Sequence, residues 1–310
     1  YDRHLKLEAI GIEGQLRLLN STILMVGAGG LGCPALQYLV AAGVGRIYLF
    51  DSDVVDMSNL QRQILFTPDD IGKNKARVAA TKLKIQNPDV EIIALDQNFD
   101  VEAAEKYMSE VDLVIDGTDN FQTRYLINDT CVLNNKPFVY GALDKFSAQL
   151  SVFNYKKGPS YRCLYPQMPA PESVPSCSQA GVLGVLPGIV GSLQALEALK
   201  VLLDLGPSLS GKLLMFDGLG QVYQTLKCPR NEVQVAKVVE NGLTGSEYVD
   251  DFICGLLNLS YLMLWPGLVI SIPMEFLLRL VYFFQYDFPA CQAIYKSGTI
   301  FTISPLFLIK

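Results

Sequence analysis

Glycines that follow an apolar run form the first stretch of this sequence that could do chemistry. The run "TILMV" leads into "GAGGLGCP", where Gly27, Gly29 and Gly32 match the spacing G-x-G-x-x-G. Such glycines permit a tight turn, a close approach of the backbone to phosphate, and close packing of the next helix on its strand. Glycines of this kind also mark ordinary turns of parallel sheets. The neighbouring residues must therefore decide between a dinucleotide, ATP and no ligand.

An acidic residue follows these glycines at the distance expected of a group that binds ribose. Asp51 stands close to the interval of about 20 residues after Gly32 at which such an acid hydrogen-bonds a ribose hydroxyl, and Asp53 lies just beyond it. NAD and ATP both contain ribose, so this spacing leaves both open. An acid that ends a strand also often caps a helix or a turn, and that role competes with ribose binding for Asp51.

Cations and amides gather after these acids. "SNLQRQ" contains Asn59, Arg62 and Gln63, and "IGKNKARVAA" brings Lys73 and Lys75 to the start of a helix. A dehydrogenase holds its pyrophosphate on backbone amides and a helix dipole. Phosphoryl or nucleotidyl transfer requires cations, because negative charge spreads over the attacked and leaving phosphates. We assign Arg62 and Lys75 to that role, and we expect Lys73 to be a solvated surface lysine.

A further carboxylate follows the apolar run "DLVID". Asp119 in "GTDN" stands beside Asn120, beyond the expected end of a strand. Magnesium is usually bound by one or two carboxylates together with the phosphates of the substrate. We therefore expect Asp119 to hold Mg²⁺ and Asn120 to lie in the same nucleotide site.

Alternating strands and helices must position these groups. The sequence predicts strands at 22–30, 46–53, 90–96 and 112–120 and helices at 31–43, 73–88 and 100–111. Pro34 near the first turn and Gly43 at the end mark the first of these helices. The pattern predicts an α/β fold, a doubly wound and mostly parallel sheet with a Rossmann-like half. Helices should cover both faces, and ligands should bind beyond the carboxyl ends of the strands.

Six motifs occur in the order found in the MoeB/ThiF/HesA family, the bacterial relatives of ubiquitin-activating enzymes, and the chain resembles that family over about residues 1 to 230. The motifs are "GAGGLGCP", "DSDVVDMSNLQRQIL", "IGKNKA", "DGTDNFQTRYLINDTCV", "YRCLYP" and "CSQAGVLGVLPGIVGSLQALEALK". The resemblance implies an enzyme that binds ATP and Mg²⁺ and adenylates the C-terminal Gly-Gly carboxylate of a ubiquitin-like sulfur-carrier protein, releasing pyrophosphate. The carrier would serve molybdopterin or thiamin biosynthesis.

The resemblance also implies roles for individual residues. Gly30 would lie in the phosphate turn, Asp51 would bind the ribose, and Arg3 would reach the active site of the partner in a homodimer. Spacing and resemblance together assign to the nucleotide site Gly27, Gly29, Gly30, Gly32, Asp51, Asp53, Asn59, Arg62, Gln63, Lys75, Asp119 and Asn120. The expected catalytic residues are Arg3, Arg62, Lys75, Asp119 and Cys177.

Cys177 has two competing interpretations. Some family members use a cysteine in this place to form a covalent intermediate with the activated carrier, and others stop at the adenylate. Its setting in "VPSCSQAGV", a loop before an expected helix, favours a solvent-accessible thiolate. A buried, inert cysteine is the alternative, because free cysteines are among the most buried residues.

The segments after residue 143 are expected to receive the carrier. The alternation at 144–166 predicts strands that form an edge of the sheet and guide the extended Gly-Gly tail. This would be an antiparallel, carrier-binding extension of the sheet. The residues at 167–182 read as a loop over the active site, and the apolar helix at 186–204 as buried core or dimer interface.

The sequence departs from the family at its metal site. Most members hold a structural zinc with two C-x-x-C pairs, but here the first pair reads "SYRC", with Ser160 in the leading position before Cys163. No C-x-x-C follows "KCPRNEVQVAKV". A tetrahedral structural zinc requires four sulfur or nitrogen ligands, so zinc is predicted to be absent.

Composition limits the partners and the compartment. The chain has 310 residues and a formal net charge of −6, so it lacks the positive charge that a nucleic-acid partner requires. Its seven cysteines, without regular spacing, suit a reducing compartment, and we expect a cytoplasmic protein.

We divide the chain into an adenylation domain at 1–250 and an apolar tail of unknown role at 251–310. No charged residue occurs from Phe252 to Met274, which makes this segment a candidate membrane span. Its prolines and its lack of basic flanking residues favour a buried or interface segment over membrane association.

Two alternatives from other classes remain open. A relative that keeps the fold but acts as a binding scaffold would account for the missing zinc ligands and the unusual tail. An NAD-dependent oxidoreductase would account only for the glycine motif and Asp51. The adenylyltransferase accounts for the glycine motif, the cation cluster and Asp119 together.

Overall fold

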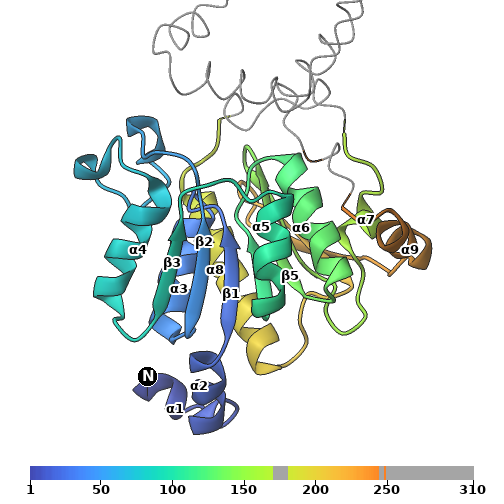
Figure 1. Ribbon diagram of the computed structural model, residues 1–310, viewed down its shortest axis with the longest axis horizontal. Coiled ribbons are helices and arrows are strands. Elements are labelled where there is room, and N and C mark those ends of the chain that lie inside the picture. The colour runs from blue at the N-terminus through green and yellow to red at the C-terminus, as the bar shows by residue number, and fades with distance from the viewer. Residues whose placement is uncertain (170–180, 244–247, 249–310) are drawn as a thin grey trace, which may run out of the picture. The chain divides into compact units, whose positions relative to one another are not determined.

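The computed structural model of the chain describes residues 1–169, 181–243 and 248 (Figure 1). These residues belong to the first of two units, Tyr1–Cys254. Cys177 and the tail at 251–310 lie outside the described residues. The expectations for both, and the boundary near residue 250, therefore stay predictions.

A single eight-stranded sheet organises the described residues, in the order β3-β2-β1-β4-β5-β6-β7-β8. The strands are β1 (Thr22–Val26), β2 (Arg46–Phe50), β3 (Glu91–Leu95), β4 (Leu113–Asp116), β5 (Phe138–Asp144), β6 (Ser147–Phe153), β7 (Lys212–Asp217) and β8 (Val222–Lys227). The neighbours from β3 to β5 pair in parallel, whereas β6, β7 and β8 are antiparallel. The predicted fold class is confirmed, including a mostly parallel half and an antiparallel extension.

Helices cover both faces of the sheet. They are α1 (Asp2–Leu5), α2 (Gly11–Leu19), α3 (Gly32–Ala42), α4 (Lys75–Gln86), α5 (Val101–Tyr107), α6 (Phe121–Leu133), α7 (Tyr161–Leu164), α8 (Val185–Leu203) and α9 (Glu232–Asn241). Short 3₁₀ helices span Met57–Asn59, Pro68–Asp70 and Met108–Glu110. One buried apolar cluster joins the sheet to α3, α4 and α8, and a second joins the opposite face to α5 and α6.

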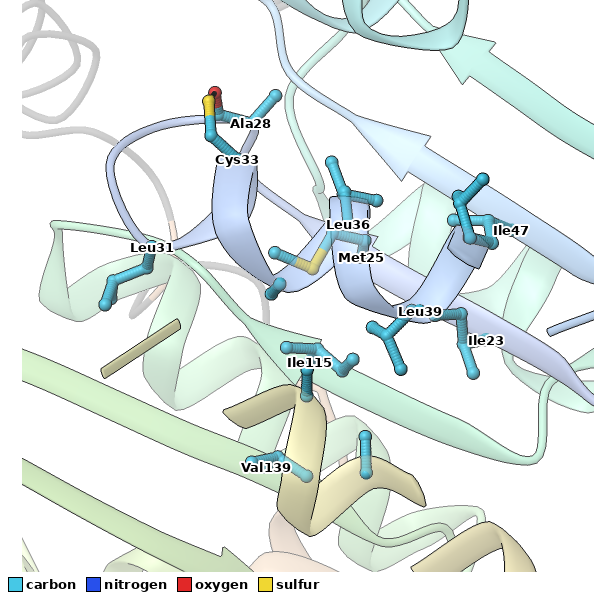
Figure 2. Close-up of a cluster of buried hydrophobic side chains, with 14 of the residues drawn as sticks. Ile23, Met25, Ala28, Leu31, Cys33, Leu36, Leu39, Ile47, Ile115 and Val139 are labelled. Atoms are coloured by element: carbon cyan, nitrogen blue, oxygen red, sulfur yellow. Dashed lines mark hydrogen bonds between the residues drawn. The ribbon is translucent and has the colours of Figure 1, made fainter. Parts of the chain in front are cut away.

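Alternation along β1 shows how one strand serves both layers. Ile23 and Met25 pack in the cluster with α3, while Leu24 and Val26 pack in the cluster with α5 and α6. Figure 2 shows the first of these clusters, where apolar side chains of α3 and of the strands meet. The residues labelled there are Ile23, Met25, Ala28, Leu31, Cys33, Leu36, Leu39, Ile47, Ile115 and Val139. All are buried, as expected of a parallel sheet covered on both faces.

The ends of α3 follow the local sequence signals. Pro34 lies in its first turn, where a missing N–H costs no hydrogen bond. Gly43 forms its C-cap at φ +83°, in the left-handed region that glycine adopts without strain. Both predicted boundaries of this helix are confirmed.

Helix α8 is a core helix. Its 19 residues are long and apolar enough to span a membrane by composition, and half of its most apolar window is buried within the protein. It packs closely on α3, since a Cβ on Gly191 would lie 2.3 Å from the carbonyl oxygen of Leu31. This contact supports the buried-core interpretation of the segment at 186–204.

The prediction that 144–166 forms an edge of the sheet is wrong. β6 pairs with β5 on one side and with β7 on the other, and β8 is the last strand. No strands were predicted for the segment at 212–227. It folds as the β7–β8 hairpin, and β7 pairs with the outer edge of β6. Residues Tyr161–Leu164 form a helix rather than a strand, and Ser160 precedes it as the N-cap.

Candidate active site

One cavity of about 1790 Å³ lies where the loops after β1, β2 and β4 meet. The predicted site residues that line it are Gly27, Gly29, Gly30, Asp51, Asp53, Asn59, Arg62, Gln63, Lys75, Asp119 and Asn120. Residues on β5, β6, β7 and β8 complete its wall. Segments separated by nearly a hundred residues in sequence therefore meet at the carboxyl edge of the parallel strands, as the α/β pattern predicts.

The glycines of the turn after β1 differ in how much space surrounds them. Gly27 has φ +96°, and a Cβ there would lie 2.7 Å from the carbonyl oxygen of Gly117. A Cβ on Gly32 would lie 2.1 Å from the carbonyl oxygen of Gly27. A Cβ on Gly29 would meet only the Gln63 amide nitrogen, at 3.8 Å, which is an ordinary contact. The protein itself therefore requires glycine at 27 and 32, whereas the Gly29 position leaves room at the cavity wall.

Asp51 is bound to the glycine turn. Its Oδ2 accepts a hydrogen bond from the Ala28 N–H at 2.7 Å, and its Oδ1 accepts one from the Asp53 N–H at 3.0 Å. Burial raises the pKa of this carboxyl, and the bond from Ala28 opposes that shift. The acid thus links the ends of β1 and β2 while it lines the cavity. That arrangement combines the turn-capping role with the position expected of a ribose ligand.

Lys75 begins α4 and lies buried at the cavity wall. Its Nζ lies 2.8 Å from Oδ2 of Asp53, and its backbone N–H donates to the Asp53 carbonyl at 2.9 Å. Asn74 caps the helix by accepting from the Arg77 N–H at 3.0 Å, and its amide donates to the Asp51 carbonyl at 2.9 Å. The cation is therefore fixed relative to the end of β2. Lys73, two residues earlier in the loop, is exposed as expected.

A short turn presents Asn59 and Arg62. Asp56 and Asn59 form a capping box, in which the Asp56 N–H donates to Oδ1 of Asn59 at 3.2 Å. The Arg62 guanidinium donates from Nη1 to the Ser58 carbonyl at 3.0 Å. Gln63 is buried, and its side-chain oxygen has no hydrogen-bond partner among the described residues. An unpaired buried acceptor is unusual in a native protein, and this one lines the cavity.

Asp119 and Asn120 occupy the turn between β4 and α6. Both are exposed, and Asn120 caps α6 by accepting from the Thr123 N–H at 2.8 Å. No group of three or more metal-binding side chains occurs in the part of the chain that the structure describes. Magnesium needs no such group, because one carboxylate and the phosphates of a nucleotide suffice. The exposed Asp119 carboxylate in a cavity lined by cations fits that donor set.

A buried ion pair that was not predicted from the sequence lies beneath this turn. Arg124 of α6 donates from Nε to Oδ2 of Asp116 at 2.8 Å and from Nη2 to the Thr118 carbonyl at 3.0 Å. Its guanidinium lies over the ring of Tyr140, 5.1 Å from the centroid. Burial opposes the charged form of Arg124, but the Asp116 carboxylate acts together with Tyr140 and Tyr161, and the net effect raises the pKa of Arg124. An acid ending the apolar run "LVID" was the available signal.

Arg3 does not line the cavity. It lies exposed on α1, near the N-terminus of the chain. A catalytic role for Arg3 would therefore have to be exerted on another copy of the chain, which is the expectation that the family resemblance gave.

At the position where relatives have the first zinc-binding C-x-x-C pair, Cys163 accepts hydrogen bonds from the backbone. The sulfur of Cys163 accepts from the backbone N–H groups of Ser160 at 3.3 Å and Asn231 at 3.2 Å. Cys228 is buried, and burial raises the pKa of its thiol. The expected absence of zinc stays a prediction.

Comparisons with known proteins identify relatives of the whole cavity region. Residues 1–236 match the model of the ThiF family. A sulfur carrier protein adenylyltransferase of Thermus thermophilus is 47% identical over 262 residues, which cover 83% of this chain and 96% of that protein. A SAMP-activating enzyme E1 of Haloferax volcanii is 47% identical over 226 residues, covering 73% of this chain and 83% of that protein.

A further sequence relative and a solved structure also match. The adenylyltransferase and sulfurtransferase MOCS3 of Xenopus laevis is 46% identical over 227 residues, which cover 73% of this chain but only 50% of that protein. The crystal structure of E. coli MccB with ATP has a TM-score of 0.61 at 24% identity, covering 71% of this chain and 66% of that one. At that identity the likeness shows the fold alone.

Proposed function

Because this chain belongs to the ThiF family, we propose that its cavity binds ATP and Mg²⁺ and adenylates the C-terminal Gly-Gly carboxylate of a ubiquitin-like sulfur-carrier protein. One observation carries the proposal. The glycine turn, the buried Lys75, Arg62 and the Asp119 carboxylate all line a single cavity. A dinucleotide site would need the glycine turn but not these cations.

The chain's own groups divide the work of adenylation. Backbone N–H groups of the glycine turn and the N-terminus of α3 can hold phosphate oxygens. The carrier carboxylate attacks the α-phosphorus, and pyrophosphate leaves. Lys75 and Arg62 stabilise the negative charge that spreads over the phosphates during this step. No general base is needed, because a C-terminal carboxylate is already ionised at neutral pH.

The metal would be held by Asp119 and the phosphates. When bound, Mg²⁺ supplies positive charge that neutralises the phosphate oxygens. Asp51, fixed at the end of β2, is placed to accept a hydrogen bond from a ribose hydroxyl.

The carrier tail would approach along the antiparallel half of the sheet. Leu143 of β5, Gln149 of β6, Met215 of β7 and Gln224 of β8 all line the cavity. An extended Gly-Gly tail could lie against these strands and bring its carboxylate to the phosphates. The cavity lining on β5, β6, β7 and the edge strand β8 supports tail binding across this whole half of the sheet, and not along an edge formed by residues 144–166.

The direct test is carrier-dependent exchange of pyrophosphate into ATP. We expect exchange with a carrier that ends in Gly-Gly and none with the same carrier amidated at its C-terminus. NAD in place of ATP should not bind. A protein that binds the carrier but exchanges no pyrophosphate would instead be the scaffold that the sequence left open.

We also propose that the chain acts as a homodimer in the cytoplasm, with Arg3 of each copy serving the other copy's site. The exposed position of Arg3 outside its own cavity supports this arrangement. The mixing experiment described in the Discussion tests it.

A further inference from the structure

Strands β4 and β5 stop pairing with each other just before the cavity. Their parallel pairing ends at Ile115↔Val139, although β4 continues to Asp116 and β5 to Asp144. Gln194 of α8 lies at the point of divergence. Its Nε2 donates to the Asp116 carbonyl at 2.7 Å and lies 3.4 Å from the Val139 carbonyl. One side-chain amide thus bridges the two strands at the point where their pairing ends.

The surroundings of Gln194 are shaped to admit its amide. A Cβ on Gly141 of β5 would lie 2.7 Å from the Gln194 amide carbon, so only glycine leaves the space. Gln194 is 0% exposed, and its Oε1 has no hydrogen-bond partner among the described residues. Burying an amide with an unpaired oxygen costs free energy that an apolar side chain would not. Core packing alone therefore does not account for a glutamine in this place on an apolar helix.

Asp116 is hydrogen-bonded from both faces of the sheet. Gln194 binds its carbonyl from the side of α8, and Arg124 binds its carboxylate from the side of α6. The same carboxylate accepts hydrogen bonds from the Thr118 N–H at 3.0 Å and the Thr118 hydroxyl at 2.6 Å. These contacts fix residues 116 to 118, and Asp119 follows them directly in the same turn.

We propose that Gln194 is a positioning residue for adenylation. Its amide holds Asp116, and with it the turn that presents Asp119 to the cavity, and it links β4 and β5 where their pairing ends. Gln194 does not line the cavity, so it acts through Asp116 and touches neither nucleotide nor carrier. The inference rests on the proposed adenylation.

The test is a double-mutant cycle. Gln194→Met removes the donor at similar volume, and Gly141→Ala crowds the amide without lining the cavity. Each should lower kcat of pyrophosphate exchange by about 10- to 100-fold, since a small misplacement of catalytic groups has effects of that size. Each should also raise the Mg²⁺ concentration at half-maximal exchange, while KM for the carrier stays close to wild type. The double variant should be no worse than the more severe single one, because both act through the same amide.

Thr130→Val is the matched control. Thr130 is buried on α6, and its hydroxyl likewise has no hydrogen-bond partner among the described residues, so it makes no hydrogen bond to Asp116. We expect this variant to keep the kcat and Mg²⁺ dependence of the wild type. Thermal unfolding of each variant corrects the kinetics for any loss of folded protein.

Two results would overturn the inference. Active wild type together with Gln194→Met that has unchanged kcat and Mg²⁺ dependence per folded molecule would leave Gln194 a packing residue. Strictly additive effects of Gln194→Met and Gly141→Ala would mean that they do not act through one contact. If wild type and Thr130→Val both lack exchange, the proposed function itself fails.

Discussion

The ammonium nitrogen of Lys75 lies 2.8 Å from a carboxylate oxygen of Asp53, and the two side chains differ in exposure, 8% for Lys75 against 69% for Asp53. The lysine is held in place by the fold, whereas the acid can turn toward solvent. An incoming phosphate can therefore replace Asp53 as the partner of Lys75 without leaving a buried carboxylate unpaired. The pair holds the cation at the cavity wall, where we propose that it meets the phosphates.

Loss of the Lys75 charge should abolish most of the exchange activity. Lys75→Ala removes a cation aimed at the phosphates and should lower pyrophosphate exchange by about 10²–10³-fold. Lys73→Ala is the matched control, since Lys73 is exposed in the preceding loop and should keep near wild-type rates. Equal rates for the two variants would contradict the assignment of Lys75.

Alanine should have different effects at two glycines of the same turn: weaker ATP binding at one and lower stability at the other. Gly29→Ala should fold normally, because its Cβ would meet nothing closer than 3.8 Å, but it should weaken ATP binding by filling the cavity wall. Gly27→Ala should lower the unfolding midpoint, because φ +96° and a contact of 2.7 Å with the Gly117 carbonyl both oppose it. Thermal unfolding and ATP titration separate the outcomes. A Gly29→Ala protein with wild-type affinity would show that ATP does not lie on this turn.

The Asp119 carboxylate should set the requirement for magnesium. Asp119→Asn keeps the shape but removes the charge, so exchange should need a higher Mg²⁺ concentration and reach a lower maximum. A magnesium titration of exchange measures both quantities. Asn120→Ala should behave differently, with a less stable α6 from the lost cap and an unchanged magnesium midpoint. An unaltered magnesium curve for Asp119→Asn would assign the metal elsewhere.

A role for Arg3 in the partner's site predicts rescue between two inactive chains. Mixing Arg3→Ala with Lys75→Ala should restore part of the exchange activity, because one site of the mixed dimer then has both an intact Lys75 and an intact Arg3. Each variant alone should remain inactive at the same total concentration. Absence of rescue in a mixture shown to contain the mixed dimer would argue that Arg3 acts within its own chain.

Cys177 lies outside the described residues. Its role decides whether the reaction continues to a covalent carrier intermediate or stops at the adenylate. We expect Cys177→Ser to retain pyrophosphate exchange, because adenylation precedes any thiol step. The variant should lose a reductant-sensitive adduct between enzyme and carrier on a non-reducing gel. If the wild type forms no such adduct with an active carrier and a sulfur donor present, the enzyme stops at the adenylate.

Local chemistry made several elements readable from the sequence. The glycine spacing, Pro34 and Gly43 are signals of backbone conformation that act within a few residues, so the first strand, turn and helix were predicted correctly. The apolar runs of the parallel strands were equally clear, because both faces of that sheet are buried. The alternation of strands and helices put the candidate site residues at strand ends and predicted that these ends would meet.

Pairing between distant segments was decided only by the tertiary structure. No local pattern shows that the hairpin at 212–227 covers β6 and moves the edge of the sheet to β8. The partner of Asp116 in the same segment, Arg124, could have been suspected, but Gln194 lies 78 residues away on another helix. The Gln194 amide fits there because Gly141 leaves space for it and the Asp116 carbonyl accepts its hydrogen bond. Such requirements arise from packing in three dimensions, and residue spacing along the chain does not encode them.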